Sequence, residues 1–337
     1  MKVCDHNVTA NTERRDKIGD KIGTVPSPVS SGAQMEFTDG ALYPPVHRWS
    51  LQMGFCSMDL KSLTDHEVKA LLPHVFKHSV AILRYHSKNN CSVGSGTLVN
   101  IGTRFFVATA AHNLVDFSDE CLILGHTKEV SYKQLQFERR RPFQNEPEPT
   151  TDVGYIELSG ATAASMPEKD FLPLEMIRPF VNSWPTRVFL AGFPSELVPK
   201  ELVMRNEFRL RGLGYLTETR NLKAAQYEDV DESRDIHVDY DKRAVFVQNQ
   251  SVVSMPEPYG ISGGGLWGLP TMGQGMLWTP ENAMLIGIDR SWMKHSRVAF
   301  CTQIQHWLRL VASDYPDLIP LIDDHLHRYA RNKGHEA

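Results

Sequence analysis

The chain has 337 residues, 41% of them hydrophobic and 23% charged, which is ordinary for a globular protein with one large core or two smaller ones. Its net charge of -4, from 36 Lys and Arg against 40 Asp and Glu, provides no general attraction to nucleic acid or anionic lipid. The N-terminus lacks the apolar core of a secretory signal, and no run approaches the roughly 18 apolar residues of a membrane helix, so we expect a cytoplasmic protein. The cysteines are scattered without metal-ligand spacing, so we expect free thiols.

The first part of the chain is predicted to stand outside the main domain. Residues 1–45 are polar and rich in Thr, Ser, Gly and Pro, with no sustained apolar period, which is typical of a mobile tail. A short helical lead-in over residues 46–75 follows, with a helix from Thr64 to Leu72. Thr64 and Glu67 form a capping box at its start, and Pro73 is expected to end it.

Short β-type runs, separated by Gly, Pro and Asn clusters, begin at about residue 76. Many short strands with few long helical periods favour an all-β fold, as an antiparallel sandwich or barrel. The predicted strands are Ser79–Tyr85, Ser95–Ile101, Arg104–Thr109, Cys121–Leu124, Gly154–Leu158, Arg187–Ala191, Glu207–Tyr215, Ala244–Val247 and Met284–Ile288.

A helical period returns near the C-terminus. Apolar side chains repeat at i, i+3 or i+4 in two stripes, which Pro316 and Pro320 separate. The stripes are Ile304, Trp307, Leu308 and Val311, then Leu318, Ile322, Leu326 and Tyr329. We interpret both as packing helices, with residues 311–337 as a C-terminal helical extension. The alternative is that the last helix docks a partner.

Three polar residues stand at positions suited to nucleophilic catalysis. Ser262 is flanked by glycines, His112 follows a predicted strand, and Asp152 precedes another. A serine hydroxyl is a useful nucleophile at neutral pH only when an imidazole accepts its proton and a third group orients that imidazole. His112, Asp152 and Ser262 are therefore a candidate catalytic triad.

The order of these motifs resembles that of the trypsin-like (chymotrypsin-fold) serine peptidases, in particular bacterial-type intracellular members. The similar segments are the histidine strand pair Gly96–Val99 and Phe106–His112, the aspartate strand Asp152–Leu158, the strand-end turn Ala191–Pro194, the nucleophile loop Gly260–Gly264 and the following strand Leu285–Ile288. The resemblance covers roughly residues 76–310. It implies two antiparallel β-barrels that join near residues 160–185, with the active site in the cleft between them.

The resemblance also implies roles for the residues. Ser262 attacks the scissile carbonyl, His112 accepts and returns the proton, and Asp152 orients the imidazole. The backbone N–H groups of Gly260 and Ser262 form the oxyanion hole. Such a serine endopeptidase needs no cofactor and no metal. Its expected partners are a protein or peptide substrate and a regulatory protein, without nucleic acid or membrane.

Two positions depart from secreted animal relatives. Ile261 stands where digestive members carry an aspartate that pairs with the new N-terminus after zymogen cleavage, so we expect a triad that forms without such processing. Asn113 stands where a cysteine often follows the histidine, so the usual nearby disulfide is missing. Regulation is then expected from the tail or from a partner, as in a latent intracellular effector protease.

Two other functions fit part of the sequence. Gly260–Gly264 also matches the G-x-S-x-G elbow of α/β-hydrolases, but that elbow needs a strand before the serine and a helix after it. Prolines precede Ser262 and glycines follow it, and the hydrolase order, with Asp289 and His306 as later partners, leaves His112 unexplained. The leading alternative is a catalytically inactive trypsin-fold module that binds peptides or protein partners.

Substrate preference is predicted from the spacing before the nucleophile. By the same resemblance, the pocket floor lies near Pro256 and Glu257, and Asp289 and Arg290 follow the strand at its wall. An acidic floor favours Lys or Arg before the cleaved bond.

Three further features are expected to be structural. His74 and His78 have the i, i+4 spacing of metal ligands but no further ligand nearby, so both are expected at the surface. The acidic stretch 228–241 is expected to form a solvated loop, and Arg139–Arg141 an exposed one.

Overall fold

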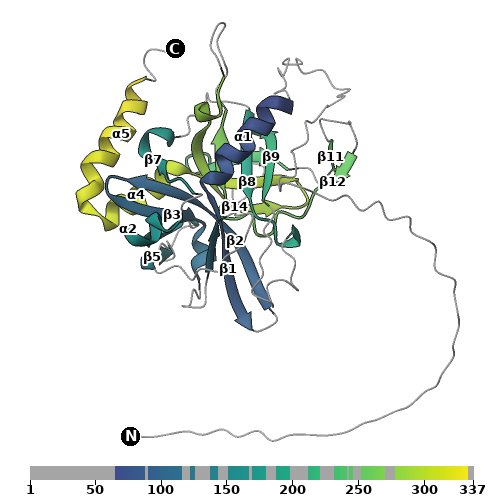
Figure 1. Cartoon of the computed structure of the whole chain (residues 1–337). Helices are drawn as coiled ribbons and strands as arrows, with labels where there is room; N and C mark the ends of the chain where they lie inside the picture. The colour runs from purple at the N-terminus through teal and green to yellow at the C-terminus, as the bar shows by residue number, and fades with distance from the viewer. Residues whose placement is uncertain are drawn as a thin grey trace, which may run out of the picture. The chain divides into compact units, whose positions relative to one another are not determined.

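The computed structural model describes residues 65–87, 90–115, 122–125, 137–142, 151–166, 169–179, 187–197, 212–220, 231–240, 243–245, 252–269 and 278–332. All of them belong to one compact unit, Asp39–Ala337. The predicted tail, residues 1–45, lies outside the described residues, as does the capping residue Thr64. Two antiparallel sheets dominate the described part (Figure 1), so the all-β fold class predicted from the sequence is confirmed.

The first sheet has seven strands in the order β4-β1-β2-β3-β6-β5, with β7 parallel to β2. Their bounds are β1 (Ser79–Ser87), β2 (Asn90–Ile101), β3 (Arg104–Thr109), β4 (Leu122–Gly125), β5 (Phe137–Pro142), β6 (Gly154–Leu158) and β7 (Leu172–Pro173). β3 and β6 pair so that Thr109 lies opposite Gly154. This register brings the segment after β3 beside the segment before β6.

The second sheet has six strands in the order β10-β15-β14-β13-β8-β9. Their bounds are β8 (Arg187–Gly192), β9 (Leu213–Glu218), β10 (Asp235–Asp239), β13 (Gly265–Gly268), β14 (Met284–Met293) and β15 (Val298–Gln303). Its two end strands also meet, because Thr219 bridges Val238 and the Arg220 N–H donates to His237 O at 2.7 Å. The sheet thus closes into a barrel. A separate ribbon pairs β11 (Arg243–Val245) with β12 (Val252–Ser254).

Two segments that were predicted as loops contain strands. Arg139–Arg141 lie in β5, and the acidic stretch contains β10, where Asp235 is buried. The carboxylate of Asp235 can be buried because Arg234 and Arg290 pair with it. Arg290 is 55 residues away in the chain, so a local charge pattern could not reveal this pairing.

Helix α1 (Asp65–Lys77) is longer than predicted, because Pro73 lies inside it rather than ending it. The prediction that His74 and His78 lie at the surface is wrong, since only 7% and 3% of them are exposed. His78 stacks on Trp267 of β13 with ring centroids 5.9 Å apart, and its Nδ1 donates to Asp170 O at 2.7 Å. Burial lowers the pKa of His78 to about 4, so the side chain is a neutral aromatic group of the core.

Short helices and 3-10 turns lie between several of the strands. α2 (Gly160–Ala164), η2 (Leu174–Met176) and η3 (Ser195–Leu197) lie in the predicted join and just after it, while η5 (Pro280–Asn282) precedes β14. Within the described residues, no helix is long and apolar enough to cross a membrane. The same residues contain no group of three or more His, Cys, Asp or Glu side chains that could hold a metal ion.

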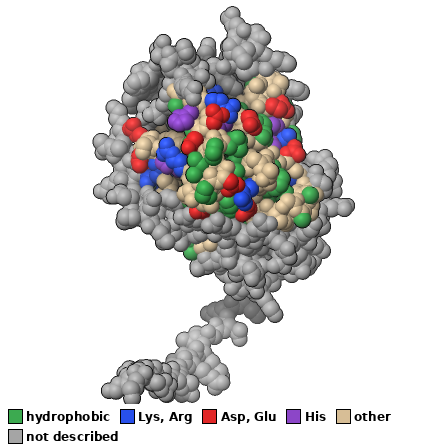
Figure 2. Space-filling model, turned by 90° about the vertical axis from the view of Figure 1, so that its left-hand side faces the viewer, with side chains coloured by type: hydrophobic (Ala, Val, Ile, Leu, Met, Phe, Trp, Pro, Cys, Tyr) green, Lys and Arg blue, Asp and Glu red, His purple; other side chains and the backbone are tan. Residues whose placement is uncertain are grey.

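The C-terminal helices α4 (Ile304–Asp314) and α5 (Ile319–Asn332), with η6 (Pro316–Leu318) between them, pack on the sheets as predicted (Figure 1). All four residues of the first stripe are fully buried, and the Trp307 Nε1–H donates to Gly154 O at 3.0 Å. Tyr315 OH donates to Glu157 Oε2 at 2.6 Å. Helices that follow the second sheet therefore pack against β6 of the first. On the face in Figure 2, apolar side chains gather centrally among charged ones.

Candidate active site

His112 lies in the 3-10 turn η1 (Ala111–Leu114), which closely follows β3. Its Nδ1 is 2.7 Å from Asp152 Oδ2, and its backbone N–H donates to Asp152 Oδ1 at 2.9 Å. One carboxylate therefore holds both the ring and the backbone of His112. A hydrogen on Nδ1 leaves Nε2 free to accept a proton. The side chain is 44% exposed, so a ligand from solvent can reach it.

Asp152 has a left-handed backbone, with φ of 44°, which is uncommon for a residue with a side chain. Hydrogen bonds hold the surrounding segment from both sides. Ala111 N–H donates to Asp152 O at 3.1 Å, Thr302 Oγ1 to Thr151 O at 2.6 Å, and Trp307 Nε1 to Gly154 O at 3.0 Å. Two of these donors belong to β15 and α4, so the second half of the chain keeps the acid in place.

Ser262 lies in the loop before β13, and several carbonyl groups of this loop accept hydrogen bonds. Ser195 N–H donates to Tyr259 O at 2.7 Å, Gly264 N–H to Ile261 O at 2.7 Å, and Ser95 N–H to Ser262 O at 2.8 Å. Gly260 has φ of 96°, and a Cβ there would lie 2.6 Å from Phe193 O. Only glycine fits this position without displacing the backbone.

The N–H groups of Gly260 and Ser262 have no hydrogen-bond acceptor among the described residues. The neighbouring N–H groups of Ile261, Gly263 and Gly264 are all bonded within the protein. Two unoccupied donors beside a serine are what a developing oxyanion requires.

Asn113 joins the histidine segment to the serine loop. Its Nδ2 donates to Ser262 O at 2.7 Å and to Thr109 Oγ1 at 3.1 Å. The Ser262 hydroxyl itself donates to Arg290 O at 3.3 Å, which is long for a hydroxyl hydrogen bond. Within the described residues, the side chains of Ser262 and His112 do not form a hydrogen bond with each other.

The residues predicted for the substrate pocket differ in their surroundings. Pro256 O accepts from Tyr240 OH at 2.9 Å, and Glu257 pairs with Lys294 at 3.3 Å. Asp289 is only 2% exposed, and burial raises the pKa of its carboxyl to about 8. Neither acid offers an unpaired negative charge at neutral pH, so these side chains do not support the expected preference for Lys or Arg.

Asp289 instead borders the serine loop from β14. Gly263 N–H donates to Asp289 O at 2.7 Å, and Asp289 N–H donates to Gly264 O at 2.9 Å. The buried Cys301 Sγ donates to Asp289 Oδ1 at 3.7 Å, and burial raises the pKa of this thiol as well. Cys301 is a free thiol, as predicted, whereas the side chains of the other four cysteines lie outside the described residues.

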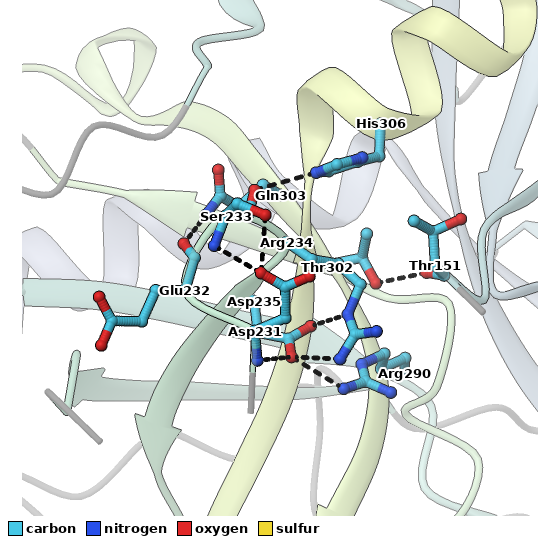
Figure 3. A network of polar contacts seen from close by, with 10 residues as sticks. All are labelled: Thr151, Asp231, Glu232, Ser233, Arg234, Asp235, Arg290, Thr302, Gln303 and His306. Atoms are coloured by element: carbon cyan, nitrogen blue, oxygen red, sulfur yellow. Dashed lines mark hydrogen bonds and ion pairs between the residues drawn. The ribbon is translucent and has the colours of Figure 1, made fainter. Parts of the chain in front are cut away.

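The fourth pocket residue, Arg290, joins the polar network of Figure 3. Its Nη2 lies 3.1 Å from Asp235 Oδ2, while Arg234 binds the same carboxylate through Nε and Nη2 at 2.8 Å each. Gln303, His306 and Thr302 extend the network along β15 and α4 to Thr151. The network therefore ends one residue before Asp152.

Sequence reasoning missed Asn113, Ser95 and Thr302. For Asn113, the sequence indicates only that the cysteine that often follows the histidine is missing. Ser95 and Thr302 are fully buried hydroxyls in strands. Both are polar side chains at apolar positions of a strand. This pattern could have indicated a hydrogen-bonding role, because a polar side chain is hydrogen-bonded when it is buried.

No family model and no curated protein matches the chain. Among solved structures, it resembles HL collagenase, with 14% identity over 71% of this chain and 93% of that one and a TM-score of 0.44. It also resembles the scabies mite inactivated protease paralogue S-D1 (12% identity, 70% and 90% covered, TM-score 0.44) and the active form of a protease from M. tuberculosis (12%, 69% and 78%, 0.36). These neighbours are trypsin-like. One of them is named as an active form and another as an inactivated paralogue.

Proposed function

We propose that the protein is a serine endopeptidase that hydrolyses peptide bonds of protein substrates, with Ser262 as nucleophile, His112 as base and Asp152 as the orienting acid. The observation that carries the proposal is the pair of hydrogen bonds, 2.7 and 2.9 Å long, by which one carboxylate holds both the imidazole and the backbone of His112. A purely structural pair does not explain why this imidazole is 44% exposed or why Asn113 binds the backbone of a glycine-flanked serine.

In the proposed reaction, Ser262 Oγ bonds to the scissile carbonyl carbon while its proton passes to His112 Nε2. The carbonyl oxygen becomes an oxyanion that accepts from the N–H groups of Gly260 and Ser262. The C–N bond then breaks, and His112 gives the proton to the leaving amine. Water attacks the resulting ester in the same way, so the acid product leaves and the serine is restored.

The Ser262 hydroxyl has to leave Arg290 O before it can bond to His112. The bond of 3.3 Å is long, so breaking it costs little. Contacts between nucleophile and base are often loose in a free enzyme and tighten when substrate binds.

Labelling with a fluorophosphonate tests the proposal. The wild type should be labelled at Ser262, identified by peptide mass spectrometry, and Ser262→Ala and His112→Ala should both lose the label. Ser291→Ala is the matched control, because Ser291 is an exposed serine of the neighbouring strand β14 and should not affect labelling.

The second candidate is a peptide-binding module that does not cleave. The bond from the Ser262 hydroxyl to Arg290 O favours it, because this hydroxyl is not aimed at an imidazole. A wild type that stays unlabelled, yet binds library peptides with the same affinity as Ser262→Ala, would support this candidate. We also propose that the protein is cytoplasmic and that a partner regulates it. A wild type labelled only after addition of a cell extract would support regulation by a partner.

A further inference from the structure

We propose that Ser95 is a positioning residue that sets the orientation of the two N–H donors beside Ser262. The proposal rests on the proposed function above. Ser95 lies in β2 of the first sheet, 165 residues before Gly260, and its side chain is fully buried. It does not touch the reacting atoms, so its effect passes through the backbone of the loop.

The Ser95 hydroxyl is bonded on both sides to backbone groups of the second half of the chain. Its Oγ donates to Gly260 O at 2.6 Å and accepts from Phe193 N–H at 2.8 Å. The backbone N–H of Ser95 donates to Ser262 O at 2.8 Å. One residue of the first sheet therefore joins the end of β8 to the serine loop.

The peptide group between Gly260 and Ile261 decides how the two donors are aligned. The Gly260 N–H belongs to the peptide group before it, and the Ser262 N–H belongs to the peptide group after it. Peptide groups are planar, so the two donors can change their relative orientation only through the dihedral angles at Gly260 and Ile261, and holding the middle group in place restrains those rotations. Its N–H donates to Pro258 O at 2.9 Å, and its carbonyl is held by the Ser95 hydroxyl.

The hydroxyl of Ser95 has little room to turn elsewhere. A Cβ on Gly192 would lie 2.8 Å from Ser95 Oγ and 2.9 Å from Ile261 Cγ2. The backbone of β8 therefore packs directly on this hydroxyl. Glycine at 192 permits that approach, and the approach in turn keeps Ser95 directed at Gly260.

Without the hydroxyl, the part-buried Gly260 O and the buried Phe193 N–H lose this partner. Such groups are costly when unpaired, so the loop is expected to rotate until they find new partners. Gly260 offers little resistance, because glycine tolerates many backbone conformations. The rotation moves the Gly260 N–H away from the position that the oxyanion occupies.

The test compares Ser95→Ala with Ser79→Ala in the full chain. Ser79 is a matched control, because it is also a buried serine of the first sheet whose Oγ donates to a backbone carbonyl, Val75 O at 3.0 Å. The readouts are the rate constant for phosphonylation by a fluorophosphonate, the inhibitor concentration at half-maximal rate, and amide hydrogen exchange in residues 258–264. Ser95→Cys, which keeps the shape of the side chain, replaces Ser95→Ala if the latter does not fold.

Ser95→Ala should lower the phosphonylation rate constant by about tenfold or more, because removing one oxyanion donor outright typically costs 10²–10³ in rate. The inhibitor concentration at half-maximal rate should stay within about twofold of the wild-type value. Amide hydrogen exchange in residues 258–264 should accelerate only in the Ser95 variants. Equal rate constants and equal exchange for the Ser95 and Ser79 variants would overturn the positioning role while leaving the proposed function intact. An unlabelled wild type would instead overturn the proposed function, and exchange alone would then decide whether Ser95 orders the loop.

Discussion

At the scale of single residues, Asp152 combines a hydrogen bond to the imidazole of His112 with a left-handed backbone. A non-glycine residue in this region costs on the order of 1–3 kcal/mol and persists where its surroundings impose it. Here the imposing contacts are hydrogen bonds from Ala111 and Thr302 to the backbone on either side. The strain therefore falls on the residue that orients the proposed base.

Asp289 makes stability depend on pH in a way that can be measured. Its carboxyl keeps a proton in the fold up to about pH 8 but loses it near 3.8 in the unfolded chain. Between these values the folded state binds one proton more, so the free energy of unfolding falls as pH rises, by up to about 1.4 kcal/mol per pH unit. Asp289→Asn removes this slope.

Urea unfolding of the wild type and Asp289→Asn at pH 5, 6, 7 and 8 checks this prediction. The stability difference in favour of the variant should grow steadily with pH. Asp324→Asn, an exposed substitution on α5, should give a constant difference. Parallel pH curves for wild type and Asp289→Asn would show that Asp289 is ionised in the fold.

At the scale of elements, β15 supports the candidate triad although it carries none of its members. Thr302 Oγ1 donates to Thr151 O at 2.6 Å, and Thr217 Oγ1 of β9 donates to Asp239 O at the same distance, away from the site. Thr302→Val and Thr217→Val should each destabilise the protein by about 1 kcal/mol. If the proposed function holds, only Thr302→Val should slow fluorophosphonate labelling, because the Thr302 bond reaches the segment of Asp152 and the Thr217 bond does not.

Strands were predictable from the sequence where their apolar residues sit between turn residues. Arg104–Thr109 and Gly154–Leu158 were predicted with the bounds that the structure has. β10 and β13 were missed for physical reasons. β10 buries charged residues that neutralise one another, and β13 is short and begins and ends with glycine. In α1, apolar residues on both sides of Pro73 are buried, and this burial stabilises the helix. The helix therefore does not end where Pro73 predicts.

At the scale of the described unit, His78 links the two sheets. His78 follows α1 directly, precedes β1 of the first sheet and stacks on Trp267 of the second. The pKa of His78 is about 4 in the fold, against 6.5 ordinarily, so the unfolded chain binds a proton first as pH falls. The stability that depends on neutral His78 is therefore present above pH 6.5 and lost progressively toward pH 4.

Replacing His78 by glutamine should remove part of this acid sensitivity. Free energies of unfolding measured by tryptophan fluorescence at pH 7, 6, 5 and 4 should fall less steeply for His78→Gln than for the wild type. His295→Gln, at an exposed position, is the control and should follow the wild type. The prediction fails if all three proteins lose stability in parallel.

The candidate site divides into what motifs reveal and what only the fold reveals. The positions of His112, Asp152 and Ser262 came from short motifs in a familiar order, and the structure brings the first two into contact. Ser95, Asn113 and Thr302 could not be assigned in this way, because each acts on a backbone group more than 140 residues away. Their roles depend on how the two sheets meet.

These long separations set an order of events during synthesis. The bonds from Ser95 to Gly260 and from Asn113 to Ser262 span 165 and 149 residues, and Asp289 holds the same loop from a later strand. Contacts so distant in the chain form late, since they require the intervening loop to close. A growing chain on the ribosome thus carries His112 and Asp152 well before Ser262 is held in place. If the proposed function holds, the unfinished protein is unable to cleave itself or its neighbours.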